Sequence, residues 1–168
     1  QPELTPVEVK VEEQVDSVDE GLSRLPTVRM HVLADGHGDF PYSKKILNGW
    51  EESVVKHELI DDVSPVVGWY RNPSTASKHS VRITYESGGK WKSVQPDLIF
   101  VREVDGVLVP SIIDPHGAHL GDALPKLKAL AQYAAAHGDN YHRITAVGLE
   151  KDNHLIGIDL KDPKVQMA

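Results

Sequence analysis

The segment QPDLIFVREVDGVLVPSIID, residues 95–114, constrains the fold more than any other part of the chain. Two apolar runs, 98–104 and 107–114, flank Asp105-Gly106, a dipeptide that strongly favours a two-residue β-hairpin turn. Consecutive apolar residues in both runs are typical of strands that are buried on both faces. We therefore expect an antiparallel hairpin near the centre of a β-sheet.

The expected register of this hairpin brings two carboxylates together. Asp97 lies eight residues before Asp105, and Asp114 lies eight residues after Gly106. A two-residue turn without a bulge then places Asp97 opposite Asp114, with both side chains on the same face. Adjacent carboxylates repel unless one is protonated or a cation lies between them. Because Mg²⁺ is commonly held by one or two carboxylates plus substrate phosphate, this edge of the sheet is a candidate metal site.

Helical and strand patterns alternate along the chain before the hairpin. Apolar spacing predicts a helix from Tyr42 to about Glu58. Alternation and β-branched residues predict a strand within 27–33, and a short apolar run closed by Asn-Pro predicts another within 64–74. The stretch SVRITYESGGKW, residues 80–91, alternates into a Gly-Gly turn, as a hairpin arm does.

A second helix is predicted after the hairpin, from Ala123 to His137. Asp122 is a suitable N-cap, Pro125 falls in the first turn, and Gly138 ends the helix. Its expected buried stripe is Leu124, Leu127, Leu130, Ala131 and Ala134. Residues 142–160 then read as a strand, a turn and a strand. The order of helices and strands predicts an α/β domain with a central mixed β-sheet flanked by helices.

The net charge of −7 is unevenly distributed. Seven acids but only one lysine fall within residues 1–20, so the rest of the chain is close to neutral. Charge therefore leaves DNA binding open without predicting it. The candidate DNA contacts are Arg71, Lys78, Arg82, Lys90 and Lys92. Trp91, between two of these lysines, suits either packing or stacking on a base.

Residues 1–40 are predicted to be an acidic linker, or the tail of a preceding domain, with an edge strand at residues 7–13. The domain itself is then expected over 41–168, and the chain is expected to be part of a longer protein. No apolar run approaches the roughly 18 residues of a membrane span, so no membrane partner is expected. The absence of cysteine suits a cytoplasmic protein and leaves only His, Asp and Glu side chains as metal ligands.

The stretch QPDLIFVREVDGVLVPSIIDPHG resembles the core of PD-(D/E)xK nucleases, in which Pro-Asp starts one strand and a second acid followed by lysine ends the next. With its flanking segments, the similarity covers roughly residues 42–160. It extends to the restriction-endonuclease-like domains found C-terminal to DEAD/DEAH helicases of type III restriction and related phage-defence proteins. The resemblance implies an endonuclease domain that uses Mg²⁺ or Mn²⁺ on foreign DNA, with a helicase domain in the same or a partner chain.

The resemblance assigns roles residue by residue. Asp97 and Asp114 match the two metal-binding acids, and His116 stands where the family has lysine. A histidine with a reference pKa near 6.5 is a plausible base or ligand but not a permanent cation. Lys126 or Lys128 on the following helix can supply that charge, and we select Lys128 as the candidate catalytic lysine. Further metal ligands implied are the Pro115 carbonyl and Glu51 or Glu52.

Two other interpretations remain open at this point. Asp-Pro-His-Gly at 114–117 also has the composition of a type I turn, so the nuclease site can be degenerate and the domain a DNA-binding or interaction module. Alternatively His116, His119 and Asp122 have the residue types of a zinc site, which would suit a small-molecule metallohydrolase.

Overall fold

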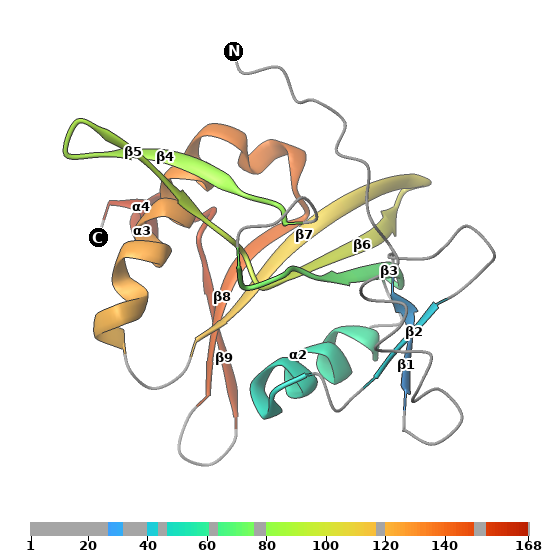
Figure 1. Cartoon of the computed structure of the whole chain (residues 1–168). Coiled ribbons are helices and arrows are strands. Elements are labelled where there is room, and N and C mark those ends of the chain that lie inside the picture. The colour runs from blue at the N-terminus through green and yellow to red at the C-terminus, as the bar shows by residue number, and fades with distance from the viewer. Residues whose placement is uncertain are drawn as a thin grey trace.

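A computed structural model describes residues 27–31, 40–43, 47–60, 64–75, 80–116, 120–149 and 154–167. Within these residues the chain forms a mixed seven-stranded sheet in the order β2-β1-β3-β6-β7-β8-β9, with helices packed on it (Figure 1). The sheet strands are β1 Thr27–His31, β2 Phe40–Ser43, β3 Val66–Arg71, β6 Leu98–Val104, β7 Val107–His116, β8 Arg143–Leu149 and β9 Leu155–Asp159. The predicted α/β class with a central mixed sheet is confirmed.

The central hairpin has the predicted position and register. β6 and β7 pair antiparallel from Val104↔Val107 to Leu98↔Ile113 without a shift, and they lie in the middle of the sheet. Asp105 and Gly106 have φ angles of 51° and 76°, the left-handed conformation that a type I′ turn requires at both central positions. The turn chemistry in the sequence therefore fixes which residues face each other along both strands.

The first helix is shorter than the sequence suggested. α2 spans Gly49–Leu59, and part of the predicted helical segment instead forms strand β2, which pairs with β1. Asn48 caps the helix by accepting from the backbone N–H groups of Trp50 and Glu51, and Glu51 bonds back to the N–H of Asn48. This reciprocal capping box is the physical reason that the helix begins at Gly49.

The segment assigned to an N-terminal linker also contributes to the sheet. β1 pairs in parallel with β3 through His31↔Trp69, and its partner β2 begins at Phe40, before the expected boundary at residue 41. The expected strand near residues 7–13 lies outside the described residues. In the described part of the chain, no helix is long and apolar enough to cross a membrane.

Helix α3, Leu120–His137, connects β7 to its parallel neighbour β8. Parallel neighbours require such a crossover connection. The helix begins three residues before the predicted start, so Asp122 is its third residue and does not occupy the N-cap position, and Pro125 falls inside the helix. Leu124, expected in the buried stripe, is 51% exposed, whereas Ala129, Leu130 and Ala134 are buried.

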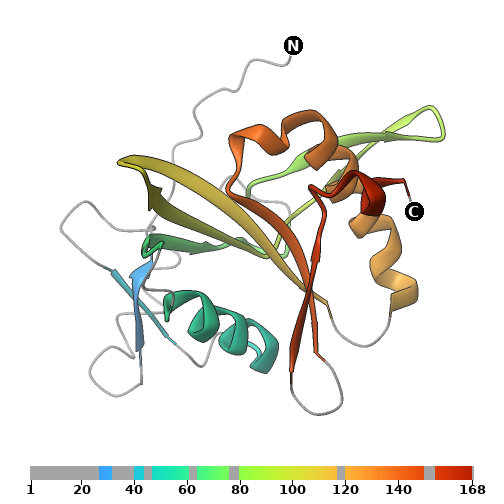
Figure 2. The same cartoon turned by 180° about the vertical axis from the view of Figure 1, so that it is seen from behind.

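A two-stranded arm projects from the sheet beside α3 (Figures 1 and 2). It consists of β4, Ile83–Ser87, and β5, Lys90–Val94, joined by the predicted Gly88-Gly89 turn, in which both glycines have positive φ. Ile83 and Val94 at its base are buried in the apolar cluster under α3. The arm is therefore anchored at its base, while its tip is polar and exposed.

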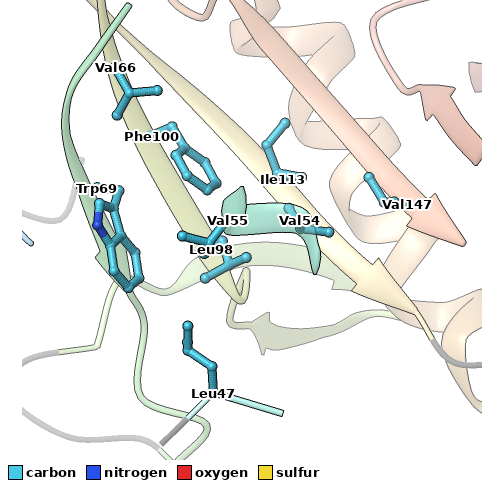
Figure 3. Packing of buried hydrophobic residues seen from close by; sticks show 9 residues of the cluster. All are labelled: Leu47, Val54, Val55, Val66, Trp69, Leu98, Phe100, Ile113 and Val147. Carbon is cyan, nitrogen blue, oxygen red and sulfur yellow. The ribbon is translucent and has the colours of Figure 1, made fainter. Parts of the chain in front are cut away.

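Two apolar cores cover the two faces of the central strands. One holds Val54 and Val55 of α2 with Trp69, Phe100 and other residues of the sheet, as Figure 3 shows. The other joins α3 and the base of the arm to Ile112 and its neighbours. Successive residues of a strand point to opposite faces, which is why Ile112 and Ile113 belong to different cores.

A buried ionic cluster ties α2 to the sheet. Arg102 on β6, 1% exposed, pairs with the carboxylate of Glu58 and also donates to the carbonyl of Ser64. Arg143 at the start of β8 contacts the same Glu58 carboxylate from a more exposed position. A buried charge needs such partners because an unpaired ion loses its hydration without compensation.

Candidate active site at the open end of the central hairpin

Asp97 and Asp114 meet at the open end of the β6–β7 hairpin, as the register predicts. The backbone N–H of Asp97 donates a 2.8 Å hydrogen bond to Oδ1 of Asp114, and the Asp97 carbonyl accepts from the N–H of Asn72. Asp114 is fully buried, whereas the side chain of Asp97 is 34% exposed. The two acids therefore form one site in which Asp114 is shielded from solvent and Asp97 is accessible to it.

The cation between the two acids is Lys126 of α3. Its Nζ lies 3.0 Å from Asp97 Oδ1 and 2.8 Å from Asp114 Oδ1. Lys128, the lysine that we selected from the sequence, is exposed and makes no contact with either acid in the described structure. Residues two apart on an α-helix point about 200° apart, so only one of the two lysines can face the acids.

The three groups shift one another's protonation. Burial raises the pKa of Asp97, and repulsion from Asp114 raises it further, despite Lys126. Burial alone would raise the pKa of Asp114, but the close contact with His116 and the charge of Lys126 hold it below its ordinary value. Burial would lower the pKa of Lys126, yet the charges of both acids raise it instead. Lys126 therefore stays protonated, and Asp114 is the more readily ionised acid.

His116 lies on the other side of Asp114. Its Nε2 is 2.7 Å from Asp114 Oδ2, although no hydrogen bond of acceptable angle joins the two atoms. Such a contact is attractive only when Nε2 carries a proton, because two bare acceptors repel. Pro115, between them in β7, pairs with Val147 of β8. The structure thus brings His116 to the site without giving it a fixed hydrogen bond.

Glu51 lies close enough for its charge to contribute to the raised pKa of Asp97, after burial, Asp114 and Lys126. It is buried at 4% exposure in the first turn of α2. One oxygen accepts from the N–H of Asn48, and the other accepts from Arg71 Nε at 3.3 Å. Arg71, predicted as a DNA contact, is therefore the ion-pair partner of Glu51, a role that the sequence did not indicate.

A hollow of about 350 Å³ opens beside the acids and is lined by Asp97, Lys126, Tyr85, Gln95 and Ser74, among others. Such a hollow is within the size range of small-ligand sites. Asp97 and Lys126 therefore face a space that a reacting group can enter.

The other predicted site residues are spread over the molecule. Arg82, Lys90 and Lys92 are exposed on or next to the arm. Lys78, His119 and the side chain of Asp122 lie outside the described residues. Within the residues that the structure describes, no three His, Asp or Glu side chains group together as a metal site. The His116, His119 and Asp122 site stays a prediction.

Residues 29–168 match the sequence pattern of the YagJ family. The chain belongs to the YagJ family. It is 41% identical over 144 residues to Protein YagJ of Escherichia coli (strain K12), an alignment that covers 86% of this chain and 57% of the relative. The chain therefore spans a little over half the length of the curated relative that it matches. No solved structure matches the chain.

Proposed function

We propose that the domain hydrolyses DNA phosphodiester bonds with the help of a divalent metal. The observation that carries the proposal is the contact of Lys126 with both Asp97 and Asp114. Two carboxylates at the end of a central hairpin and one lysine beside them are the charged groups that such a reaction needs: acids to hold a cation, and a positive charge for the phosphate.

The order of elements supports a restriction-endonuclease-like core. Helix α2 is followed by β3, β6 and β7 as antiparallel neighbours, and then by α3 and the parallel strand β8. Asp97, after Pro96, immediately precedes the middle strand of the three, and Asp114 lies two residues before the end of the third. The resemblance to PD-(D/E)xK nucleases rests on the order of helix, hairpin, Pro-Asp, second acid and lysine-bearing helix, and these elements follow one another here as α2, β4–β5, Pro96-Asp97, Asp114 and α3.

The residues present fit Mg²⁺ or Mn²⁺ held mainly by two acids. Asp97 is partly exposed and lines the hollow, and Asp114 Oδ2 is buried in contact with His116 Nε2 but without a well-aligned hydrogen bond. Mg²⁺ usually keeps several waters and takes one or two carboxylates plus substrate phosphate, so a third acid is not required. Glu51 and the Pro115 carbonyl are further candidate ligands, and Glu51 would first have to give up part of its contact with Arg71.

Each side chain then has a separate task. A bound metal would polarise the phosphate and make its bound water more acidic. Lys126 would turn from the acids to the phosphate and offset the negative charge that develops there. His116, in the position of the family's lysine, would orient the attacking water or accept its proton.

The wider role follows only from the resemblance. We propose that the domain acts on foreign DNA as the nuclease part of a helicase-nuclease. Nucleotide-driven movement along DNA would belong to another domain or a partner chain.

A catalytically degenerate module is the second candidate, and one observation favours it. Lys126 already satisfies both acids, as it would in a purely structural ion cluster. In that case the domain would bind DNA or a partner protein without cleaving either.

Metal dependence of DNA cleavage separates the two candidates. The protein is incubated with single- and double-stranded DNA in EDTA, Mg²⁺ or Mn²⁺, and the products are resolved by electrophoresis. The nuclease proposal predicts cleavage with either metal and none in EDTA. Intact DNA under all conditions, from protein that still binds DNA, would support the degenerate module instead.

A further inference from the structure

A groove runs between the arm and helix α3 and leads to the candidate active site. The hollow beside Asp97 and Lys126 is continued by a second one of about 530 Å³ along the arm. Tyr85 of the arm and Pro125 of α3 line both hollows, so the two are contiguous. The arm and the helix also lie side by side in both views (Figures 1 and 2).

Lysines line both walls of the second hollow. Lys92 lies on the arm and Lys128 on α3, and both are exposed. In the described part of the chain neither ammonium is paired with an acid, in contrast to Lys126. Glu86 is the one acid among the lining residues of this hollow, and it occupies an arm position that alternates with those of Tyr85 and Ser87. The walls thus offer cationic groups that are free to contact an anionic ligand.

The pleat of the arm decides which of its side chains face the groove. Tyr85 is paired with Lys92 and Ile83 with buried Val94, so these side chains share the face toward α3. Trp91 is paired with Glu86 on the alternate positions and is 75% exposed. Tyr85 is therefore the aromatic ring of the groove, and Trp91 belongs to the outer face of the arm.

We propose that this groove binds a single-stranded DNA segment and directs its backbone to Asp97 and Lys126. Single-strand sites combine a cationic groove with aromatic rings on which bases stack. Here Lys92 and Lys128 would supply the positive charge and the half-buried Tyr85 would supply the ring. The hollows have the volumes of small-ligand sites, which suits successive nucleotides. In a duplex the bases are stacked on one another inside the helix and are not available to stack on Tyr85, so the ring favours a single strand. The inference deepens the proposed nuclease function and rests on it.

The test is a binding measurement made without metal. Fluorescence anisotropy of a short fluorescein-labelled oligothymidylate is followed in EDTA, so that the result does not depend on cleavage. We expect the Lys92→Ala/Lys128→Ala variant to bind about tenfold more weakly and its salt dependence to fall by about 1.4 in log–log slope, about 0.7 for each lost phosphate contact. Both side chains are exposed, so their removal leaves the fold intact.

Two controls locate the binding surface. Lys56→Ala/Lys164→Ala removes the same charge from α2 and from the short helix α4, Pro163–Gln166, and is expected to bind like the unaltered protein. Trp91→Ala changes only the outer face of the arm and should also bind normally.

The inference is overturned if the unaltered protein does not bind the oligonucleotide, or if the groove variant binds as well as the control variant. Equal or tighter binding of a hairpin duplex, or loss of binding in Trp91→Ala alone, would also overturn it. A protein that binds through the groove but never cleaves would overturn only the nuclease function.

Discussion

The backbone N–H of Asp97 donates a 2.8 Å hydrogen bond to Oδ1 of Asp114, the oxygen that also contacts Lys126. Asp97, the residue before β6, thus orients Asp114, which lies near the end of β7. Because the two strands are joined by a two-residue turn without a bulge, the hairpin alone sets this geometry. The relative position of the two acids is therefore set by the strand pairing at the centre of the sheet.

Replacement of the two acids should affect stability unequally. Asp114 is fully buried and contacts the Asp97 N–H, Lys126 and His116, so Asp114→Asn should cost about 3 kcal/mol in the free energy of unfolding. Asp97 is partly exposed, and an exposed ion pair contributes little to stability. Asp97→Asn should therefore lower the free energy of unfolding by less than about 1 kcal/mol. Urea unfolding of both variants measures the difference. A larger loss for Asp97→Asn would contradict the burial order of the two acids.

Removal of Lys126 should have opposite effects on metal binding and on catalysis. Lys126→Met leaves two carboxylates without their cation, so Mn²⁺ should bind several-fold more tightly in a calorimetric titration. The same variant lacks the positive charge for the phosphate and should cleave DNA about 10²-fold more slowly. Lys128→Met is the control for the titration, because Lys128 does not contact the acids. Weaker Mn²⁺ binding by Lys126→Met would show that the acids do not hold the metal.

Buried His31 should make stability depend on pH. Burial against Trp69 and Tyr70 lowers its pKa from 6.5 to about 4, so the folded protein keeps it neutral where the unfolded chain would protonate it. Stability should therefore fall as the pH is lowered from about 6.5 to about 4, by about 3 kcal/mol in total, and this contribution should then level off. Urea unfolding across this range should show a flatter profile for His31→Phe. Parallel profiles for the two proteins would exclude His31 as the cause.

The ionic cluster at Glu58 should be more sensitive to loss of Arg102 than of Arg143. Arg102→Met removes the buried partner and should destabilise the fold by about 3 kcal/mol. The side chain of Arg143 is 37% exposed, so Arg143→Met should cost about 1 kcal/mol or less. Thermal unfolding of both variants tests the order, and equal losses would contradict it.

The sequence predicted the hairpin well because its determinants are local. Asp105-Gly106 specifies the turn, and counting outward along two regular strands places Asp97 beside Asp114. The predicted first helix starts too early because its apolar spacing continues into strand β2, whereas the Asn48–Glu51 capping box marks the actual start of α2.

The choice of lysine depended on the rotational phase of α3, which tertiary packing sets. Lys126 precedes buried Ala129 and Leu130 by three and four residues and therefore lies on the same side of the helix. That spacing is a signal in the sequence that favours Lys126. The predicted buried stripe includes the exposed Leu124, however, and this rotates the predicted buried face of the helix away from Lys126. The pairing of Arg71 with Glu51 joins β3 to α2 and had no local signal at all.

The most direct test of the central claim is the rate of Mn²⁺-dependent cleavage of single-stranded DNA by Asp97→Asn. Asp105→Asn is the matched control, because it makes the same chemical change at the exposed hairpin turn, where asparagine also accepts a positive φ. We predict that Asp97→Asn lowers the rate at least about 10²-fold, as expected when a metal ligand or a transition-state contact is lost, while Asp105→Asn cleaves at the unaltered rate. Equal rates for all three proteins would contradict the assignment of Asp97 and Asp114 as the site of phosphodiester hydrolysis.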